Sequence, residues 1–239
     1  MIQTKTIAYS SGTIDFHGFL AYKPTDTPSS RPGVLVAHAW GGRDSFAENK
    51  ARLLAEMGYT ALAIDLYGKG AKGSNPEENA ALMKPLMENR NELQSRMALG
   101  LETIKQIPGV DASRIAAIGF CFGGLAVLDL ARTGANFRGA VSFHGLLTPP
   151  DNIPKPAIRA AILALHGYDD PMATPEQLAG FADELTMAGA DWQIHAYGGT
   201  VHAFTNPEAY NPDFGTVYNE RAATRAWESM QRFLDEVLK

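Results

Sequence analysis

The sequence predicts an α/β fold: a mostly parallel, doubly wound sheet with helices on both faces and an N-terminal antiparallel hairpin. Three observations predict it. Short apolar runs alternate with longer helical segments along most of the chain. These runs are apolar on both faces, as buried parallel strands are. The first segment alone has the form of a hairpin. The 239 residues are 45% apolar and 20% charged, which suits one domain over residues 1–239.

The N-terminal segment differs from the remainder of the chain. Lys5–Tyr9 and Ile14–Tyr22 are strand-like runs on either side of a Ser-Ser-Gly turn, so we expect a hairpin at the edge of the sheet. The polar, proline-rich stretch 24–32 follows it. We interpret this stretch as a loop between strands, because too little chain precedes it to form a domain.

The alternating pattern then continues to the C-terminus. Strands are predicted at Gly33–Ala37, Thr60–Leu66, Arg114–Gly119, Gly139–Phe143, Ala160–His166 and Asp191–Tyr197. Helices are predicted at Phe46–Met57, Pro76–Ile107, Leu125–Thr133, Glu176–Met187 and Glu220–Leu238. We expect the long second helix to break near Pro85. In open α/β sheets ligands bind at the carboxyl ends of the strands, so the residues that follow each strand are the candidates for function.

Composition narrows the class of protein. The net charge is −5, from 21 Lys and Arg against 26 Asp and Glu, and nothing suggests the basic surface of a nucleic-acid binder. A single cysteine excludes an intramolecular disulfide and fits a reducing compartment. The N-terminus has no signal-peptide pattern, and no apolar run is long enough to cross a bilayer. We expect a cytoplasmic protein without a membrane partner, as a monomer or weak homodimer.

The single cysteine lies in a turn between a strand and a helix. The run Gly119–Gly124 reads GFCFGG, which is the G-x-C-x-G form of a nucleophile elbow with Cys121 at its centre. Such a sharp turn strains the central residue and exposes its side chain, and the small flanking residues let neighbouring backbone approach. The helix N-terminus favours a thiolate there. The alternative is a small buried hydrophobe, as lone cysteines often are.

The partners of a cysteine nucleophile are expected downstream, in the order acid, then histidine. His202 lies in the loop between the last predicted strand and the last helix, where the general base of such a fold belongs. Asp169 and Asp170 both follow the preceding strand. We favour Asp170, because Pro171 restricts it to an extended conformation, although either could belong to a solvated turn.

An oxyanion hole needs two backbone donors. The N–H of Phe122 follows the nucleophile, and the N–H of Trp40 is the candidate from the turn after the first parallel strand. The Gly-Gly pair after Trp40 could also be an ordinary flexible turn. Trp40 and Phe122, together with His144, Tyr168 and Phe204, are expected to line the substrate pocket, although the aromatic residues could equally belong to the core.

These motifs resemble the dienelactone hydrolase family of α/β-hydrolases. The resemblance rests on Ala63–Gly68 (AIDLYG), Gly119–Gly124, Gly167–Pro171 (GYDDP) and Val201–Phe204 (VHAF), in matching order from about residue 12 to the end. It implies an α/β-hydrolase fold and a hydrolase without cofactor or metal, whose triad is Cys121, His202 and Asp170.

Two positions depart from the family pattern. Dienelactone-cleaving members carry a glutamate after the third strand, where this chain has Ala39, and an arginine four residues after the histidine, where it has Asn206. The departures place dienelactone itself in doubt as the substrate. Without the glutamate, we predict that Cys121 pairs directly with His202 and that its pKa is lowered.

The sequence therefore predicts a cysteine hydrolase of ester or lactone bonds in small molecules, acting through an acyl-thioester. The alternative is a protein of the same fold that binds or senses oxidation through Cys121 without catalysis. A metal-dependent hydrolase is not favoured, because the chain has no H-E-x-x-H or C-x-x-C motif.

Overall fold

The structure is a computed structural model that describes residues 1–24, 30–153 and 157–239. Its strands are β1 (Gln3–Ser11), β2 (Ile14–Tyr22), β3 (Arg31–Ala37), β4 (Thr60–Ala63), β5 (Val110–Phe120), β6 (Gly139–Phe143), β7 (Ala161–Gly167), β8 (Trp192–Tyr197), β9 (Tyr210–Asn211) and β10 (Thr216–Val217). Its helices are α1 (Ser45–Glu56), α2 (Pro76–Glu88), α3 (Arg90–Lys105), α4 (Phe122–Arg132), α5 (Pro175–Met187) and α6 (Glu220–Val237).

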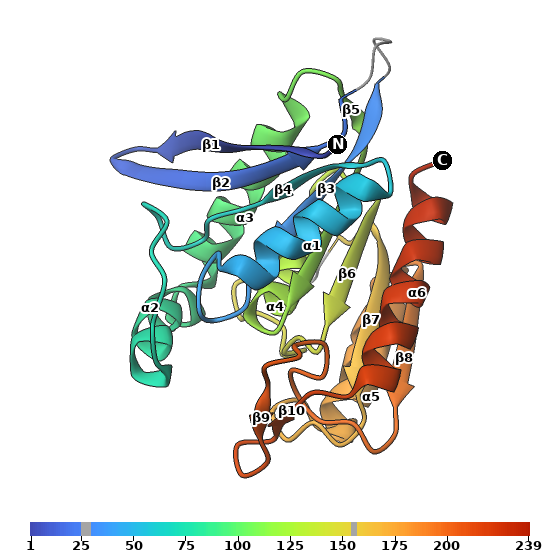
Figure 1. The fold of residues 1–239 in the computed structure, drawn as a ribbon. Coiled ribbons are helices and arrows are strands. Elements are labelled where there is room, and N and C mark those ends of the chain that lie inside the picture. The colour runs from blue at the N-terminus through green and yellow to red at the C-terminus, as the bar shows by residue number, and fades with distance from the viewer. Residues whose placement is uncertain (25–29, 154–156) are drawn as a thin grey trace.

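The main sheet has eight strands in the order β1-β2-β4-β3-β5-β6-β7-β8. The strands from β4 to β8 in this order run parallel to one another, whereas β2 pairs antiparallel with both β1 and β4. Figure 1 shows the hairpin at one edge of the sheet and β8 at the other. The predicted fold, including the N-terminal hairpin, is therefore confirmed.

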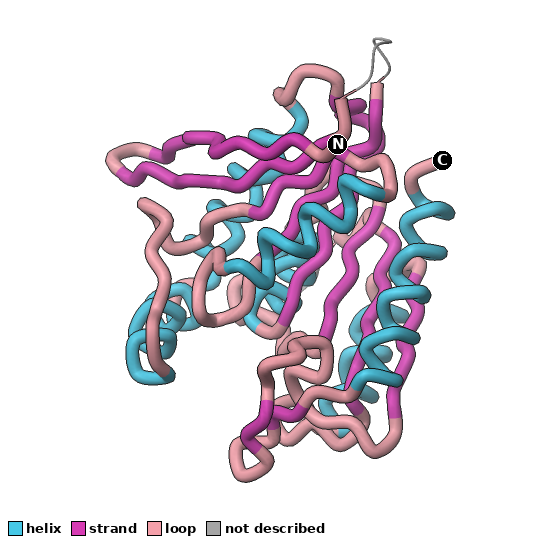
Figure 2. Tube along the Cα trace, viewed as in Figure 1, coloured by secondary structure: helices cyan, strands magenta, loops and turns pink. Residues whose placement is uncertain are grey.

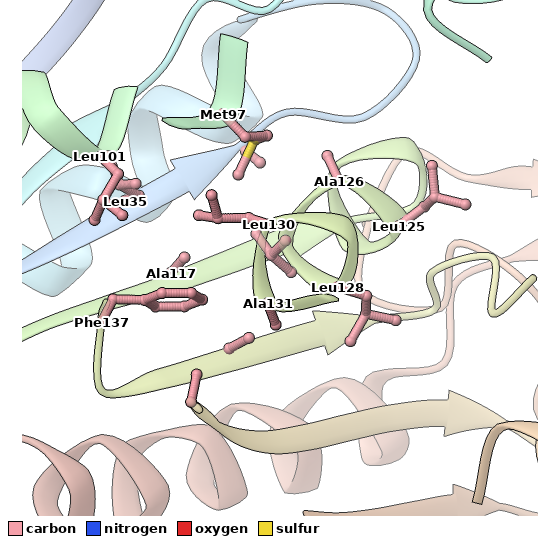
Figure 3. Close-up of a cluster of buried hydrophobic side chains, with 14 of the residues drawn as sticks. Leu35, Met97, Leu101, Ala117, Leu125, Ala126, Leu128, Leu130, Ala131 and Phe137 are labelled. Atoms are coloured by element: carbon pink, nitrogen blue, oxygen red, sulfur yellow. The ribbon is translucent and has the colours of Figure 1, made fainter. Parts of the chain in front are cut away.

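Helices cover both faces of the sheet. One face packs on α1 and α6, and Val36 and Ile118 point into that layer. The other face packs on α3, α4 and α5, and Leu35 and Ala117 point into it. In Figure 3, Met97 and Leu101 from α3 lie around Leu130 from α4 in this second layer. Neighbouring residues of one strand enter opposite layers, which explains why the strands are apolar on both faces.

Several predicted boundaries differ from the structure; β5 begins at Val110 and not at Arg114, and α4 begins at Phe122 and not at Leu125. The long helix does break, but at Asn89, and Pro85 lies inside α2. The side chain of Asn89 accepts a hydrogen bond from the N–H of Glu92 and so begins α3 as a new helix. Of the predicted loop 24–32, residues 25–29 lie outside the described residues, and Arg31 already belongs to β3.

Another difference is the early end of β4 at Ala63, whereas the apolar run predicted a strand to Leu66. Buried Asp65 causes the strand to end. Its carboxylate accepts hydrogen bonds from the backbone N–H groups of His17, Tyr67, Gly68 and Gly70. These bonds turn the chain away from the sheet.

The carboxyl ends of the parallel strands meet at one edge of the molecule. The segment that carries β9 and β10 lies beside the ends of β5 and β6, as the loops in Figure 2 show. Across the described part of the chain, no helix is long and apolar enough to span a membrane.

Candidate active site

Cys121 lies between the last residue of β5 and the first residue of α4. Its backbone has φ 53° and ψ −115°, a region that L residues with a side chain rarely adopt. Its backbone N–H donates to the carbonyl oxygen of Phe143 at 3.0 Å and to Nδ1 of His144 at 3.2 Å. Neighbouring β6 and the residue after it therefore hold the strained turn in place.

Glycine at three positions allows this turn to pack. A Cβ atom on Gly119 would lie 2.0 Å from the carbonyl oxygen of Gly123, and one on Gly123 would lie 2.2 Å from that of Ala37. A Cβ atom on Gly124 would lie 2.7 Å from Oγ of Ser142. The start of α4 thus lies against the backbone at the end of β3 and beside β6, as the glycine pattern predicts.

His202 and Asp170 form a buried pair. Nδ1 of His202 lies 2.7 Å from Oδ2 of Asp170, and both side chains are almost completely buried. The other oxygen of Asp170 accepts a hydrogen bond from the N–H of Met172 at 2.8 Å. Asp169 is exposed, and its backbone N–H bonds to Thr200. The structure therefore brings Asp170 to the histidine and leaves Asp169 at the surface.

The free nitrogen of His202 faces the cysteine. Nε2 is buried and has no hydrogen-bond partner of standard geometry among the described residues. It is nevertheless close enough to Cys121 for the two groups to change each other's pKa. Burial raises the pKa of the Cys121 thiol, but the nearby His202 charge and the backbone N–H groups of Phe122 and Trp40 outweigh it, so the pKa is lowered overall.

The pKa of His202 changes in the opposite direction. Burial lowers it, but the Cys121 thiolate and the Asp170 carboxylate both favour the imidazolium and raise the pKa of His202 to about 10. A lowered thiol pKa and a raised imidazole pKa together favour a thiolate–imidazolium pair over the neutral pair.

The backbone N–H groups of Phe122 and Trp40 both donate toward the Cys121 sulfur. The loop that carries Trp40 is held on two sides. The hydroxyl of Tyr67 donates to the carbonyl oxygen of Trp40 at 2.7 Å. Buried His38 donates from Nδ1 to the carbonyl oxygen of Ala39 at 2.6 Å. Two fixed donors thus converge on the sulfur.

His144 lies beneath the cysteine turn. Its Nδ1 accepts the N–H of Cys121, and its Nε2 donates to Oγ1 of Thr205 at 2.7 Å. Its ring meets that of His202 edge-on, with centroids 5.2 Å apart. Burial and the nearby His202 charge hold the pKa of His144 well below its usual value. His144 is therefore a neutral imidazole whose tautomer is set by its two partners.

A cavity of about 500 Å³ lies over the cysteine. Its described lining is Ala39, Trp40, Asp44, Phe46, Pro76, Met83, Phe120, Cys121, Phe122, His144, Leu146, Met172, His202, Ala203, Asn206, Glu208, Ala209, Tyr210, Asn211, Phe214 and Thr216. The volume suits a small molecule, and the walls are mostly apolar. A larger, more polar groove beside the N-terminus of α6 contains none of the three site residues.

Two of the predicted pocket residues lie elsewhere. Tyr168 is 47% exposed and does not line the cavity, because it lies in the turn after β7 with its N–H bonded to Tyr197. Phe204 is fully buried and packs edge-on against the rings of His144 and Tyr197, so it supports the site from the core. Trp40, Phe122 and His144 do line the cavity.

Sequence reasoning missed the wall supplied by residues 206–216. This segment forms the small β9–β10 hairpin and contributes Asn206, Glu208, Ala209, Tyr210, Asn211, Phe214 and Thr216 to the lining. The turn-forming residues Asn211–Gly215 between two short extended pairs were the available signal. The described ranges contain no group of three or more His, Cys, Asp or Glu residues placed to hold a metal ion.

Comparison with known proteins agrees with the fold. The profile of the Dienelactone hydrolase family matches residues 16–238. A curated protein of Bradyrhizobium sp, named "Probable 2-oxo-3-(5-oxofuran-2-ylidene)propanoate lactonase", is 30% identical over 245 residues, covering 97% of this chain and 95% of that protein. The solved structure of m3DLH is 35% identical, with a TM-score of 0.93 over 100% of this chain and 99% of that one.

A second solved structure is that of P91, titled a dienelactone hydrolase-like promiscuous phosphotriesterase from metagenomic libraries. It is 32% identical, with a TM-score of 0.93 over 100% of this chain and 99% of that one. The family profile spans nearly the whole chain, and each of these three relatives covers at least 97% of the chain. The chain belongs to the dienelactone hydrolase family of α/β-hydrolases.

Proposed function

We propose that this protein hydrolyses ester or lactone bonds of small molecules with Cys121 as nucleophile, His202 as general acid and base, and Asp170 as the residue that orients His202. The observation that carries the proposal is the joint placement of a strained, partly exposed cysteine, a histidine paired at 2.7 Å with a buried aspartate, and two backbone donors at the sulfur. Membership in a hydrolase family supports it. The family's lactonase relative supports the ester or lactone class.

The reaction follows from this arrangement in two halves. The Cys121 thiolate attacks the carbonyl carbon, and the N–H groups of Phe122 and Trp40 stabilise the oxyanion, at about 3 kcal/mol for a donor of this kind. The C–O bond then breaks, and the His202 imidazolium protonates the leaving oxygen. Neutral His202 next removes a proton from water, which attacks the acyl-thioester; the acid leaves and the thiolate is restored.

The test measures hydrolysis of 4-nitrophenyl acetate and an aromatic lactone. We expect Cys121→Ala and His202→Asn each to lower kcat/KM by at least about a thousandfold. His195→Asn is the matched control, because His195 lies on β8 and bonds to Ser229 outside the cavity. Mass spectrometry of the quenched enzyme should show an acyl group on Cys121. Full turnover by Cys121→Ala would exclude the proposed nucleophile.

Neutral phosphotriesters are a second candidate substrate class. The described lining of the cavity contains no lysine or arginine, so nothing there favours a charged phosphate over a neutral triester. The similar P91 structure is titled a phosphotriesterase. Thiolate attack on phosphorus would expel an aryloxide and leave a phosphorylated Cys121 for water to hydrolyse. Release of 4-nitrophenol from diethyl 4-nitrophenyl phosphate tests this class beside the esters.

A further inference from the structure

The charges in the cavity are unbalanced. Of the ionisable side chains in the described lining, Asp44 and Glu208 are carboxylates, and no lysine or arginine accompanies them. His144 is neutral, for the reasons given above. A Cys121 thiolate and a His202 imidazolium together carry no net charge. The positive end of α4 acts within its first turn, where it faces that thiolate. The substrate space therefore has an excess of negative charge.

Two cations of α1 and the loop before it, Lys50 and Arg43, are engaged outside the lining. Lys50 has its Nζ 4.9 Å, 5.7 Å and 4.7 Å from the ring centroids of Phe46, Phe120 and Trp227. Two of these rings, Phe46 and Phe120, line the cavity, whereas Lys50 does not. Burial lowers the pKa of Lys50 to about 8. Lys50 therefore lies behind the aromatic wall and not within the substrate space.

Arg43 precedes Asp44 in the chain but does not neutralise it. Its guanidinium pairs with Glu48 and donates from Nε to the carbonyl oxygen of His17 at 2.7 Å. The Asp44 carboxylate instead accepts the N–H of Ala47 at 3.1 Å and begins α1. Asp44 is thus a lining residue whose carboxylate has no bonded basic side chain among the described residues.

The aromatic side chains of the cavity lining also favour a positively charged ligand. The rings of Trp40 and Phe214 stack with centroids 6.1 Å apart, and Tyr210 lies in the same wall. The faces of aromatic rings attract cations and apolar groups and do not attract anions. Aromatic faces and two carboxylates around one space are the chemistry that recognises an ammonium group.

We propose that the site selects by charge: it accepts esters and lactones whose non-reacting part is cationic or neutral and apolar, and it rejects those that carry a carboxylate. The substrate class rests on the proposed hydrolysis, but the charge preference belongs to the cavity itself. It therefore has a readout that needs no turnover.

That readout is the modification of Cys121, the only cysteine in the chain. Three methanethiosulfonates of similar size carry a trimethylammonium, a methyl or a sulfonate group, and each forms a disulfide with a thiolate and releases methanesulfinate. The rate at which each reagent modifies Cys121 is divided by its rate with free N-acetylcysteine thiolate, which removes differences in intrinsic reactivity. We expect the normalised rate of the cationic reagent to exceed that of the anionic one by at least about tenfold at low salt, and by less at high salt.

Variants identify the source of the preference. Asp44→Asn keeps the cap on α1, because Asn and Asp cap helices equally well, and removes only the charge. Glu208→Gln changes an exposed side chain. Each should reduce the cationic-to-anionic ratio, and the double variant should reduce it most. Glu236→Gln is the control, because Glu236 lies in the last turn of α6, outside the lining, and should leave the ratio unchanged.

The esters complete the test. Phenyl acetate is compared with its 4-carboxy and 4-trimethylammonio analogues, each rate divided by that for alkaline hydrolysis. The expected order of kcat/KM is cationic or neutral above anionic. Hydrolysis of all three without preference, or faster labelling by the sulfonate reagent, overturns the charge inference and leaves the proposed function standing. Selective labelling without hydrolysis of any ester overturns the proposed function and leaves the charge preference of the cavity standing.

Discussion

Cys121 and His202 depend on each other for their charge. The raised pKa of His202 stabilises the folded protein fully below pH 6.5, and this contribution is lost as the pH rises through about 10. The lowered pKa of Cys121 has the opposite sign: its contribution is present above pH 9.0 and is lost as the pH falls through the folded value. The pair therefore exists as an ion pair between the lowered cysteine pKa and about 10.

This coupling predicts the pH dependence of alkylation. The rate of Cys121 with iodoacetamide should reach half of its first plateau below pH 9.0, and change again near pH 10, where His202 loses its proton. In His202→Asn the first midpoint should move upward, because the cation that lowers the thiol pKa is absent. Mass spectrometry of the labelled chain gives the rates. Equal midpoints in the two proteins would show that His202 does not set the thiol pKa.

Local sequence explains why some residues of the candidate site could be predicted and others could not. Cys121, His202 and Asp170 could be named because the turn and the order of the motifs carry the information locally. Tyr168 and Phe204 are close to these residues in sequence, but their side chains take other directions, one to solvent and one to the core. Side-chain direction in an irregular loop depends on packing partners that no local pattern records.

At the scale of elements, the start of α4 controls how the nucleophile is presented. The helix N-terminus can reach the end of β3 only because Gly123 has no side chain. The same contact fixes the position of the N–H of Phe122 relative to the loop that carries Trp40. A change in the packing of α4 against β3 should therefore also change the distance between the N–H groups of Phe122 and Trp40.

A pair of glycine substitutions tests this dependence. Gly123→Ala would place a Cβ atom 2.2 Å from the carbonyl oxygen of Ala37, so we expect a loss of at least about 1–3 kcal/mol in the free energy of unfolding, and lower activity. Gly180→Ala is the control, because Gly180 lies in α5 with nothing within 4 Å of the added atom. It should gain up to about 1 kcal/mol.

Urea unfolding measures both variants. If Gly123→Ala does not fold, the amount of soluble protein relative to Gly180→Ala gives the same comparison. A Gly123→Ala protein as stable and active as the parent would mean that α4 tolerates a shift away from β3.

The β9–β10 hairpin shows the limit of sequence reasoning for elements. Its strands have two residues each, which is too short for a periodic pattern. Its place beside the cavity is fixed by contacts distant in sequence, such as Gly215 against Pro171. The long strands and helices could be predicted because each repeats its pattern over several turns or pleats, although Asn89 and Asp65 moved two of their ends.

At the scale of the whole molecule, the strand order joins the two halves of the chain. β3 pairs with β4 on one side and with β5 on the other, and each is a parallel partner. Each of the two apolar layers contains residues from both the N-terminal and the C-terminal half of the chain. Within the described residues, the two halves therefore do not bury separate cores.

We therefore propose that the chain unfolds as one domain. Trp40, Trp192 and Trp227 lie in the cavity wall, in β8 and in α6, so their fluorescence reports three regions. The urea transition followed by tryptophan fluorescence should coincide with that followed by far-ultraviolet circular dichroism. Two separate transitions would show that part of the sheet unfolds on its own.

The attachment of the β9–β10 hairpin has a consequence for how such a protein can diversify. The N–H of His202 donates to the carbonyl oxygen of Gly215 at 3.0 Å, and the N–H of Val217 donates to the carbonyl oxygen of His202 at 3.2 Å. β10 and Gly215, the turn residue before it, are thus fixed to the histidine, while Tyr210 and Phe214 line the cavity. Substitutions at these two lining residues can reshape the cavity while the histidine keeps its place. The residues that set the substrate range and the histidine can then evolve separately, although they lie within about a dozen residues of each other in the chain.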